Sequence, residues 1–215
     1  MADRITGKQF DESSGVADWR ALWGGGFACT YFQTGSFGAG AALVQAISGI
    51  PAVANHHVDV DLRADGVTVR LFSHEPGGLS SDDVGLAQEI SAAAQTLGVP
   101  ADPSAVQQVQ VSIDALVIPE VLPFWRAVLG YQEVSEEDVF DPRRSGPPFT
   151  FQQMDAQRPQ RNRIHVDVYI PRDQAEARIG AALAAGGHIV SDAHAPNWWT
   201  LADAEGNEVD LAIWG

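Results

Sequence analysis

Residues 67–74 read VTVRLFSH and alternate in character along the chain. Apolar residues occupy positions 67, 69 and 71, whereas positions 68, 70, 72 and 74 carry Thr, Arg, Phe and His. Successive side chains of a β-strand point to opposite faces, so this stretch predicts a strand with one apolar face. The apolar face would lie against a core, and His74, at the end of the strand, would point away from it.

The segments on either side of this strand predict a strand, helix, strand, helix order. An aromatic stretch at 27–32 predicts a strand, and an alanine-rich stretch at 38–50 predicts a helix that Gly49 and Pro51 stop. After the glycine turn at 77–78, Ser80 or Ser81 is expected to cap a second helix that ends at Gly98. Its apolar residues recur at helical spacing, at Val84, Ala87, Ile90, Ala94 and Leu97.

A change of composition divides the chain near its middle. Residues 99–104, VPADPS, contain two prolines and few apolar residues and predict a linker, with a boundary near Ala101. The length of 215 residues exceeds the roughly 100 to 150 residues of a common single domain. Two domains, at about 1–100 and 105–215, are therefore favoured over one large domain.

The second half of the chain repeats its own pattern. A strand at 109–114, a helix at 120–129 and a strand at 131–134 are followed by the same order at 164–170, 174–185 and 188–190. Residues 149–154 would end the first copy, and 199–214 would form a final hairpin around 205–207. The predicted fold class is α+β, with a βαβββ unit used twice in the second domain and helices on one face of a largely antiparallel sheet in each domain.

Charge and composition exclude several classes of protein. The chain has 28 acidic and 13 basic residues, and a net charge of −15 would repel a nucleic acid backbone. With 45% hydrophobic and 19% charged residues it can build a substantial core. The first eight residues lack an apolar run, and polar residues interrupt the most apolar stretch, 37–54, so we expect a soluble cytoplasmic protein without membrane association.

Cys29 is the single cysteine, so it has no partner for an internal disulfide, and no cysteine-rich metal spacing exists. A small buried residue in a strand is favoured over a catalytic thiol.

Three histidines and an aspartate are expected to meet at one edge of the first sheet. His56 and His57 follow the first helix, His74 ends the next strand, and Asp83 lies in the first turn of the second helix. Imidazoles titrate near neutrality and can act as both general acid and general base. This arrangement indicates acid–base chemistry that needs no metal.

These residues lie in three stretches, NHHVDVDL at 55–62, VTVRLFSH at 67–74 and GGLS at 77–80, that together with Asp83 resemble the signature of the pterin-4a-carbinolamine dehydratase (4a-hydroxytetrahydrobiopterin dehydratase) family. In that family a His-His pair precedes a strand ending in Ser/Thr-His, followed by Gly-Leu-Ser/Thr and an aspartate that opens a helix. Trp19 also matches a tryptophan common in this fold. The resemblance covers roughly residues 15–98 and implies a cofactor-free lyase that dehydrates 4a-hydroxytetrahydrobiopterin to quinonoid dihydropterin.

The resemblance also implies roles for single residues. His57 and His74 would exchange protons with the substrate, His56 would contact the pterin, and Asp83 would orient a histidine or the pocket. Asp83 also has a purely structural explanation, because the exposed N–H groups of a helix N-terminus favour an acidic residue there.

Two further positions, Thr68 and Arg70, are substrate-binding candidates on the outward face of the predicted strand. They could equally be solvated strand positions.

Three departures from the family pattern support a different function. Val58 stands where the family usually has proline, Ala64 where it has an aromatic residue, and Ala52 where it has an acidic or polar one. The alternative is a non-catalytic protein that binds a pterin or aromatic ligand, or a regulator. The family commonly associates through sheet edges and helices, which implies a homo-oligomer, although the appended domain could block that contact.

The second half is similar to the vicinal oxygen chelate superfamily, which includes glyoxalases, bleomycin-resistance proteins and extradiol dioxygenases. The resemblance rests on PFWRAVLGY at 123–131, RIHVDV at 163–168 and LADAEGNEVDL at 201–211. Metal-using members take a ligand from each of four strands, and these positions hold His165 and Asp210 but also Gln110 and Gln152. Because two amides make a poor divalent site, we expect no metal. A metal-dependent glyoxalase- or dioxygenase-type activity is the second alternative.

The second pocket is expected to bind an apolar or aromatic ligand, if it binds one. Its candidate hydrogen-bonding residues are Gln110, Gln152, His165 and Asp210, and we place His188 and His194 in surface loops. Four tryptophans either wall the pocket or fill the core: Trp125, Trp198, Trp199 and Trp214.

Overall fold

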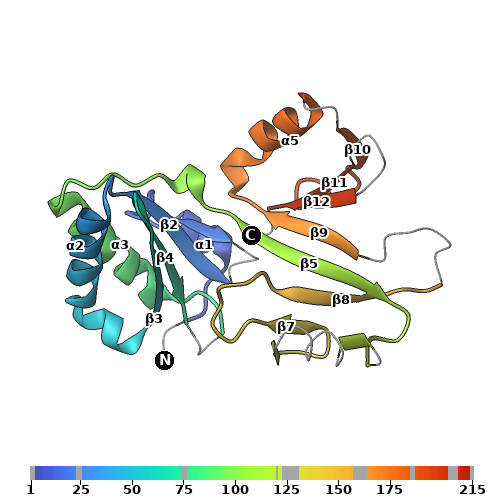
Figure 1. Ribbon diagram of the computed structural model, residues 1–215, viewed down its shortest axis with the longest axis horizontal. Helices are drawn as coiled ribbons and strands as arrows, with labels where there is room; N and C mark the ends of the chain where they lie inside the picture. The colour runs from blue at the N-terminus through green and yellow to red at the C-terminus, as the bar shows by residue number, and fades with distance from the viewer. Residues whose placement is uncertain are drawn as a thin grey trace. The chain divides into compact units, whose positions relative to one another are not determined.

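A computed structural model describes residues 3–22, 26–73, 77–119, 121–122, 131–156, 164–184, 187–202 and 208–213 (Figure 1). The chain forms two compact units. The N-terminal unit comprises Met1–Gln107 together with Pro171–Gln174 and Ile213–Gly215. The C-terminal unit comprises Gln108–Ile170 and Ala175–Ala212.

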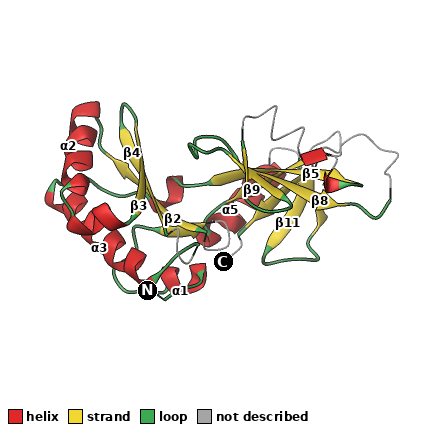
Figure 2. Ribbon diagram, turned by 90° about the horizontal axis from the view of Figure 1, so that it is seen from below, coloured by secondary structure: helices red, strands yellow, loops and turns green. Residues whose placement is uncertain are grey.

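The N-terminal unit contains a four-stranded antiparallel sheet in the order β1-β2-β4-β3. Two long helices, α2 and α3, lie beside the sheet (Figures 1 and 2), and their side chains share its hydrophobic core. The elements in chain order are α1 (Gly7–Asp11), β1 (Arg20–Leu22), β2 (Phe27–Gln33), α2 (Phe37–Ser48), η2 (Pro51–Asn55), β3 (His57–Leu62), β4 (Gly66–Phe72), α3 (Ser81–Thr96) and η3 (Pro103–Ala105).

The alternation predicted for 67–74 is confirmed over the part that the structure describes. Val67, Val69 and Leu71 are fully buried and pack in the core cluster. Thr68 and Arg70 lie on the opposite face and are half-buried. One face of β4 therefore belongs to the core, as expected for a strand covered by helices on one side.

The predicted helix over 80–97 is confirmed as α3. Ser80 is its N-cap, and Asp83 completes a capping box with the Ser80 backbone and hydroxyl. Gly98 follows the helix with φ of +68°, the left-handed conformation that glycine adopts without strain. Leu97, expected on the apolar face, is 45% exposed, and Leu86 is the buried leucine of this helix.

The sequence did not lead us to expect β3, which begins at His57. It pairs antiparallel with β4, so that His57 lies opposite Phe72, Asp59 opposite Arg70, and Val60 opposite Val69. This register places His57 and Asp59 on the outward face of the sheet.

The segment predicted as a linker is hydrogen-bonded along β2. The Gln33 N–H donates to the Pro100 carbonyl at 2.9 Å, and the Asp102 N–H donates to the Tyr31 carbonyl at 2.7 Å. Val106 packs with Leu22 and Cys29 in a small cluster on the outward face. Residues 99–107 therefore form part of the N-terminal unit.

The C-terminal unit is an eight-stranded sheet in the order β10-β11-β12-β9-β5-β8-β7-β6 (Figure 1). Its two halves meet at the antiparallel pair β5 and β9, and within each half the first strand runs parallel to the last. Its elements are β5 (Gln108–Ala115), β6 (Gln132–Glu133), β7 (Asp138–Phe140), β8 (Phe149–Gln153), β9 (Ile164–Tyr169), α5 (Ala175–Ala184), β10 (His188–Ser191), β11 (Trp198–Ala202) and β12 (Glu208–Ala212). The short helix η4 (Arg172–Gln174), between β9 and α5 in the chain, belongs to the N-terminal unit.

This arrangement is the paired βαβββ fold that the internal repeat predicts. The final hairpin is confirmed as β11 and β12, whereas most of the helix predicted at 120–129 lies outside the described residues. In each half the first strand pairs in parallel with the last strand, β5 with β8 and β9 with β12. The sheet is therefore mixed rather than purely antiparallel.

The two faces of the C-terminal sheet differ in character. On one face Ile113, Val139 and Phe151 are buried and pack with Ile118 and Leu122. The strand registers place on the other face a set of polar side chains: Gln110, Ser112, Asp114, Thr150, Gln152, His165, Asp167, Thr200 and Asp210. The polar face is the one that could carry chemistry.

Among the described residues, no helix is both long enough and apolar enough to cross a membrane.

Candidate functional site

His56 is held by the backbone of the turn that precedes β3. It follows η2, and its Nδ1 lies 3.0 Å from the carbonyl oxygen of Ala52. Because a carbonyl only accepts, Nδ1 carries the proton, and in the neutral ring Nε2 keeps the lone pair. The orientation of His56 therefore depends on the backbone carbonyl of Ala52. It does not depend on the Ala52 side chain, which is where this chain departs from the family pattern.

His57 opens β3 and is exposed. Its cross-strand neighbour is Phe72, so it projects from the face opposite the valine core of β4. His74, predicted to face it, lies outside the described residues.

Asp83 connects the start of α3 with the end of β4. It is fully buried, and its Oδ2 accepts hydrogen bonds from the Ser80 N–H at 2.7 Å and the Ser80 hydroxyl at 2.8 Å. The Ser73 hydroxyl donates to the same oxygen at 2.8 Å. Ser73 and Gly78 also exchange two backbone hydrogen bonds of 3.0 Å. The residue directly before His74 is thereby fixed on its backbone and its side chain.

Arg70 and Thr68 are built into the outward face of the sheet. The Arg70 guanidinium lies 5.8 Å from the centroid of the Phe27 ring, and its strand neighbours are Cys29 and Asp59. Thr68 has Tyr31 and Asp61 as neighbours. Both residues share this face with His57, but Arg70 is packed against an aromatic ring rather than standing free in solvent.

Cys29 is buried in β2, as the sequence predicts. Burial raises the pKa of its thiol to about 11. A thiol in this state is a poor nucleophile, because the thiolate is the reactive form.

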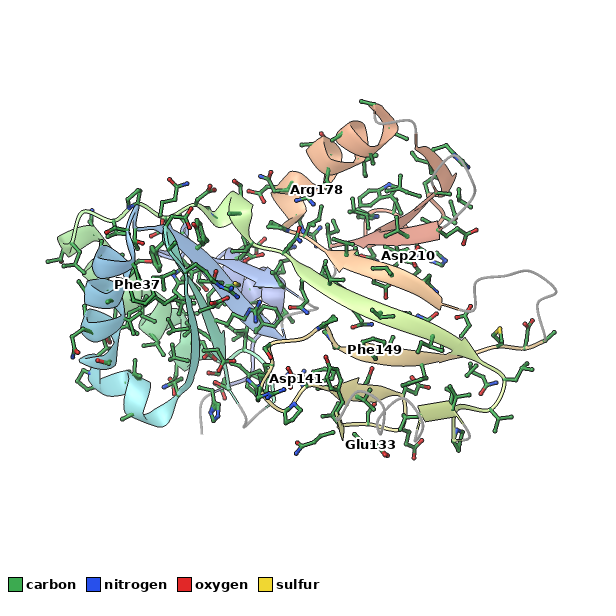
Figure 3. The ribbon with its side chains drawn as sticks, viewed as in Figure 1. Phe37, Glu133, Asp141, Phe149, Arg178 and Asp210 are labelled. Atoms are coloured by element: carbon green, nitrogen blue, oxygen red, sulfur yellow. The ribbon has the colours of Figure 1, made fainter. Side chains whose placement is uncertain are left out.

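The C-terminal unit contains a second group of titratable side chains, the acid–imidazole cluster of Asp114, His165, Asp167 and Asp210. The His165 Nε2 lies 3.5 Å from Asp167 Oδ1 and 3.9 Å from Asp210 Oδ2, and its Nδ1 lies 3.9 Å from Asp114 Oδ1. Asp114 and Asp167 are buried, while His165 and Asp210 are half-buried. Figure 3 shows Asp210 on β12, next to β9.

Burial raises the pKa of Asp167 above its ordinary value. The hydrogen bond from Ser112 and the nearby imidazole of His165 oppose this shift. The carboxylates of Asp210 and Asp114 reinforce it, because like charges disfavour ionisation. Three carboxyl groups around one imidazole thus form the most charge-crowded region of the polar face that the structure describes.

Two of the four second-pocket candidates belong to this cluster, and the other two flank it. Gln110 is buried and pairs in register with Asp167, and Gln152 is exposed and pairs in register with Asp114. Sequence reasoning did not select Asp114 or Asp167. The sequence did contain a signal for Asp167. This residue stands two positions after His165 in a predicted strand, and side chains two positions apart in a strand lie on the same face.

The aromatic candidates of the second domain lie only partly within the described residues. Trp198 is half-buried, and its ring stacks on His194 with centroids 4.0 Å apart and planes at 13°. Trp199 is also half-buried, whereas Trp125 and Trp214 lie outside the described residues. His194 is exposed in a turn, as expected, but His188 begins strand β10 and is not in a loop.

Comparison with known proteins separates the chain into two matched regions. Residues 3–93 match the family described as "Pterin 4 alpha carbinolamine dehydratase", and residues 110–212 match a glyoxalase-like domain. A crystal structure of a glyoxalase/bleomycin resistance protein/dioxygenase superfamily member from Vibrio splendidus 12B01 covers 50% of this chain and 99% of its own, at 12% identity and a TM-score of 0.35.

Two curated relatives carry the name of the family that matches residues 3–93. A protein of Roseiflexus sp. (strain RS-1), named "Putative pterin-4-alpha-carbinolamine dehydratase", is 33% identical over 90 residues, which are 42% of this chain and 96% of the relative. A protein of the same name from Nocardia farcinica (strain IFM 10152) is 41% identical over 58 residues, 27% of this chain and 61% of the relative. A glyoxalase-like domain follows the N-terminal region. Because the Roseiflexus protein is matched over nearly its whole length, the N-terminal region shows that the chain belongs to the pterin-4a-carbinolamine dehydratase family.

Proposed function

We propose that the N-terminal unit dehydrates 4a-hydroxytetrahydrobiopterin to quinonoid dihydropterin by histidine acid–base catalysis, without a metal or organic cofactor. The observation that carries this proposal is the family match over residues 3–93, which includes His56, His57, His74 and Asp83. The pterin, a small-molecule substrate, would bind at the outward face and edge of the N-terminal sheet.

The reaction needs two proton transfers. A base takes the proton from N5 of the pterin ring, the C4a–O bond breaks as N5 and C4a form a double bond, and an acid protonates the departing hydroxyl, which leaves as water. His57 and His74 share these transfers, since imidazole serves as either acid or base near neutral pH. His56, with its Nδ1 on the Ala52 carbonyl, presents Nε2 to the pterin as a hydrogen-bond acceptor.

Asp83 is a positioning residue in this proposal. Its carboxylate holds Ser73, and Ser73 precedes His74. The three hydrogen bonds to Oδ2 join Ser73, the residue directly before His74 in the sequence, to the start of α3.

The experiment is a stopped-flow assay of chemically generated carbinolamine with the full chain, compared with His57→Ala and His74→Ala. General acid–base groups typically contribute about 10²–10⁴-fold, so each variant should slow the catalysed reaction by a factor in that range. His188→Ala, a change at an exposed position of the C-terminal unit, is the matched control and should leave the rate unchanged. A wild-type rate equal to the spontaneous rate would reject the proposal.

A second candidate function is pterin binding without turnover. It is favoured by the departures at Ala52 and Val58, whose side chains are half-buried and pack against the hydrophobic core. Saturable pterin binding, measured by fluorescence, with no acceleration of the dehydration would support this candidate over the enzyme.

A further inference from the structure

An open groove lies at the C-terminal end of α3, within the N-terminal unit. Its volume is about 550 Å³, and it is bounded by the loop before β1, the later turns of α3 and the turn that follows this helix. The polar side chains that line it are Asp18, Gln88, Ser91 and Gln95. A volume of this size suits a small organic molecule rather than a single ion or water molecule.

The groove is separate from the edge of the sheet where the dehydration is proposed to occur. Asp83 lies in the first turn of α3, whereas Ser91 and Gln95 lie in the second half of the helix. The 16 residues of α3 span about 24 Å. A ligand in the groove would therefore bind at the opposite end of α3 from Asp83.

Hydrogen bonds from neighbouring elements hold two of the polar side chains in place. The Gln88 Nε2 donates to the Ser14 carbonyl at 2.7 Å, so the amide oxygen of Gln88 is kept as an acceptor. The indole N–H of Trp19, a residue that is 1% exposed, donates to the Ser91 Oγ at 3.0 Å. Because both side chains are fixed by the fold, a ligand would not have to order them.

Asp18 gives the groove its charge. It is half-buried, and among the described residues that line the groove it is the charged one. The hydroxyl of Thr30, which is fully buried, donates to the main-chain carbonyl of Asp18 at 2.7 Å and fixes its backbone. No basic side chain in the described part of the chain forms an ion pair with the Asp18 carboxylate. This carboxylate therefore favours a cation that brings N–H donors.

The end of α3 adds to the negative potential of the groove. A helix macrodipole places partial negative charge at the C-terminus, where basic side chains of the last turn are stabilising. The last turn of α3 has no basic residue. A cation bound beside Gln95, in this last turn, would take that place. The net charge of −15 for the whole chain also favours cations over anions.

We propose that this groove binds a small organic cation that carries a guanidinium group. The planar guanidinium presents a fork of N–H donors that matches the two oxygens of one carboxylate, here that of Asp18. Its remaining N–H groups can donate to the amide oxygen of Gln88. Ala92 and Pro100 also line the groove and offer apolar surface to a methylene chain attached to the guanidinium.

The test titrates the full chain with two ligands that share a butane chain and a charge of two. Agmatine carries one guanidinium and one ammonium group, and putrescine carries two ammonium groups. Calorimetry measures affinity, and the indole ¹H–¹⁵N signal of Trp19, assigned with Trp19→Phe, reports binding next to Ser91. We expect one equivalent of agmatine, a shift of the Trp19 signal, and putrescine affinity lower by about tenfold or more.

Three variants locate the cation. Asp18→Asn should weaken agmatine binding by about tenfold or more, because an amide lacks the charge and the second acceptor oxygen. Gln95→Glu adds a carboxylate of the same size to the groove and should strengthen binding several-fold. Asp82→Asn removes one exposed carboxylate at the other end of α3 and should bind as the wild type does.

Asp18→Asn keeps the main-chain carbonyl that accepts from Thr30, and circular dichroism shows whether it folds. If it does not fold, Gln95→Glu decides the matter. A folded wild type that shows no saturable agmatine binding at millimolar concentrations overturns the proposal, as does unchanged affinity in Asp18→Asn or in Gln95→Glu. Equal affinities for agmatine and putrescine would mean that charge alone is recognised, and would overturn the guanidinium assignment. None of these measurements depends on the dehydration assay.

Discussion

The hydroxyl of Ser73 donates a 2.8 Å hydrogen bond to Asp83 Oδ2, and this bond joins the end of β4 to the first turn of α3. The same oxygen accepts hydrogen bonds from the N–H and the hydroxyl of Ser80, the N-cap residue of α3. A residue that the family resemblance assigns to the active site is therefore also a structural residue. In the proposed function the two roles are linked, because Ser73, which Asp83 holds, directly precedes His74 in the sequence.

Replacement of Asp83 should affect both stability and rate. Asp83→Ala removes the acceptor of three hydrogen bonds and leaves buried donors unsatisfied, so we expect about 2–3 kcal/mol less unfolding free energy. Urea denaturation measures this loss. Asp82→Ala, at an exposed position in the same turn, is the control and should change stability by less than about 0.5 kcal/mol.

Ser73→Ala separates the two roles of Asp83, since it leaves both hydrogen bonds to Ser80 in place. It should lower kcat of the dehydration more than it changes KM, while the helix cap persists. Equal kcat in Ser73→Ala and wild type would show that the bond does not position the catalytic strand end.

His56 offers a test of the proposed contact with the pterin. His56→Asn places an amide N–H near the position of Nδ1 and can keep the hydrogen bond to the Ala52 carbonyl, but it removes Nε2. We expect KM for the carbinolamine to rise several-fold in both His56→Asn and His56→Ala, and only His56→Ala to lose stability as well. Steady-state kinetics and urea unfolding of the two variants measure the difference. If His56→Asn had wild-type KM, Nε2 would not contact the substrate.

Cys29 should be unreactive in the folded protein. It is 1% exposed, and a pKa of about 11 leaves roughly one thiolate in a thousand at pH 8. Labelling with a thiol-reactive chromophore should be slow in buffer and should reach one equivalent in denaturant. Fast labelling of native protein would contradict the buried position of this strand residue.

The predictions from sequence succeeded where a local pattern determines the structure. The alternation around Val69 and the start of α3 both depend on neighbours in the chain. The alternation was predicted, and the helix cap was predicted at Ser80 or Ser81, of which the structure shows Ser80. Strand β1 has three residues, too few for a period to show. Strand β3 reads HVDVDL and was considered only for its histidine, although its valines alternate with acidic residues in strand fashion.

The acid–imidazole cluster could not be predicted from local sequence patterns alone. Asp167 shares a face with His165 by simple alternation, but its position beside Asp210 depends on the parallel register of β9 and β12. The approach of Asp114 depends in the same way on the pairing of β5 with β9. Register between strands distant in sequence is set by packing of the whole sheet, so a single sequence does not reveal which carboxylates meet.

The turn after β7 gives a pH-dependent prediction outside both candidate sites. Asp141, labelled in Figure 3, accepts hydrogen bonds on Oδ2 from the Ser145 hydroxyl at 2.6 Å and from the backbone N–H groups of Ser145 and Gly146. Its Oδ1 accepts from the Arg143 N–H at 2.9 Å. The Ser145 hydroxyl and these backbone donors stabilise the carboxylate form and hold the pKa of Asp141 well below its usual range.

A carboxyl group whose pKa is lowered by folding stabilises the native state above its unfolded pKa, about 3.9 for aspartate. This stabilisation should be complete at pH 7 and should disappear as the pH falls from about 4 toward the folded pKa. Asp141→Asn should therefore be less stable than wild type at pH 7, and the difference should shrink in urea denaturation at successively lower pH. Glu136→Gln, an exposed change shortly before it in the chain, should show no such trend. A difference between Asp141→Asn and wild type that stays constant from pH 7 to pH 3 would mean that ionised Asp141 does not organise this turn.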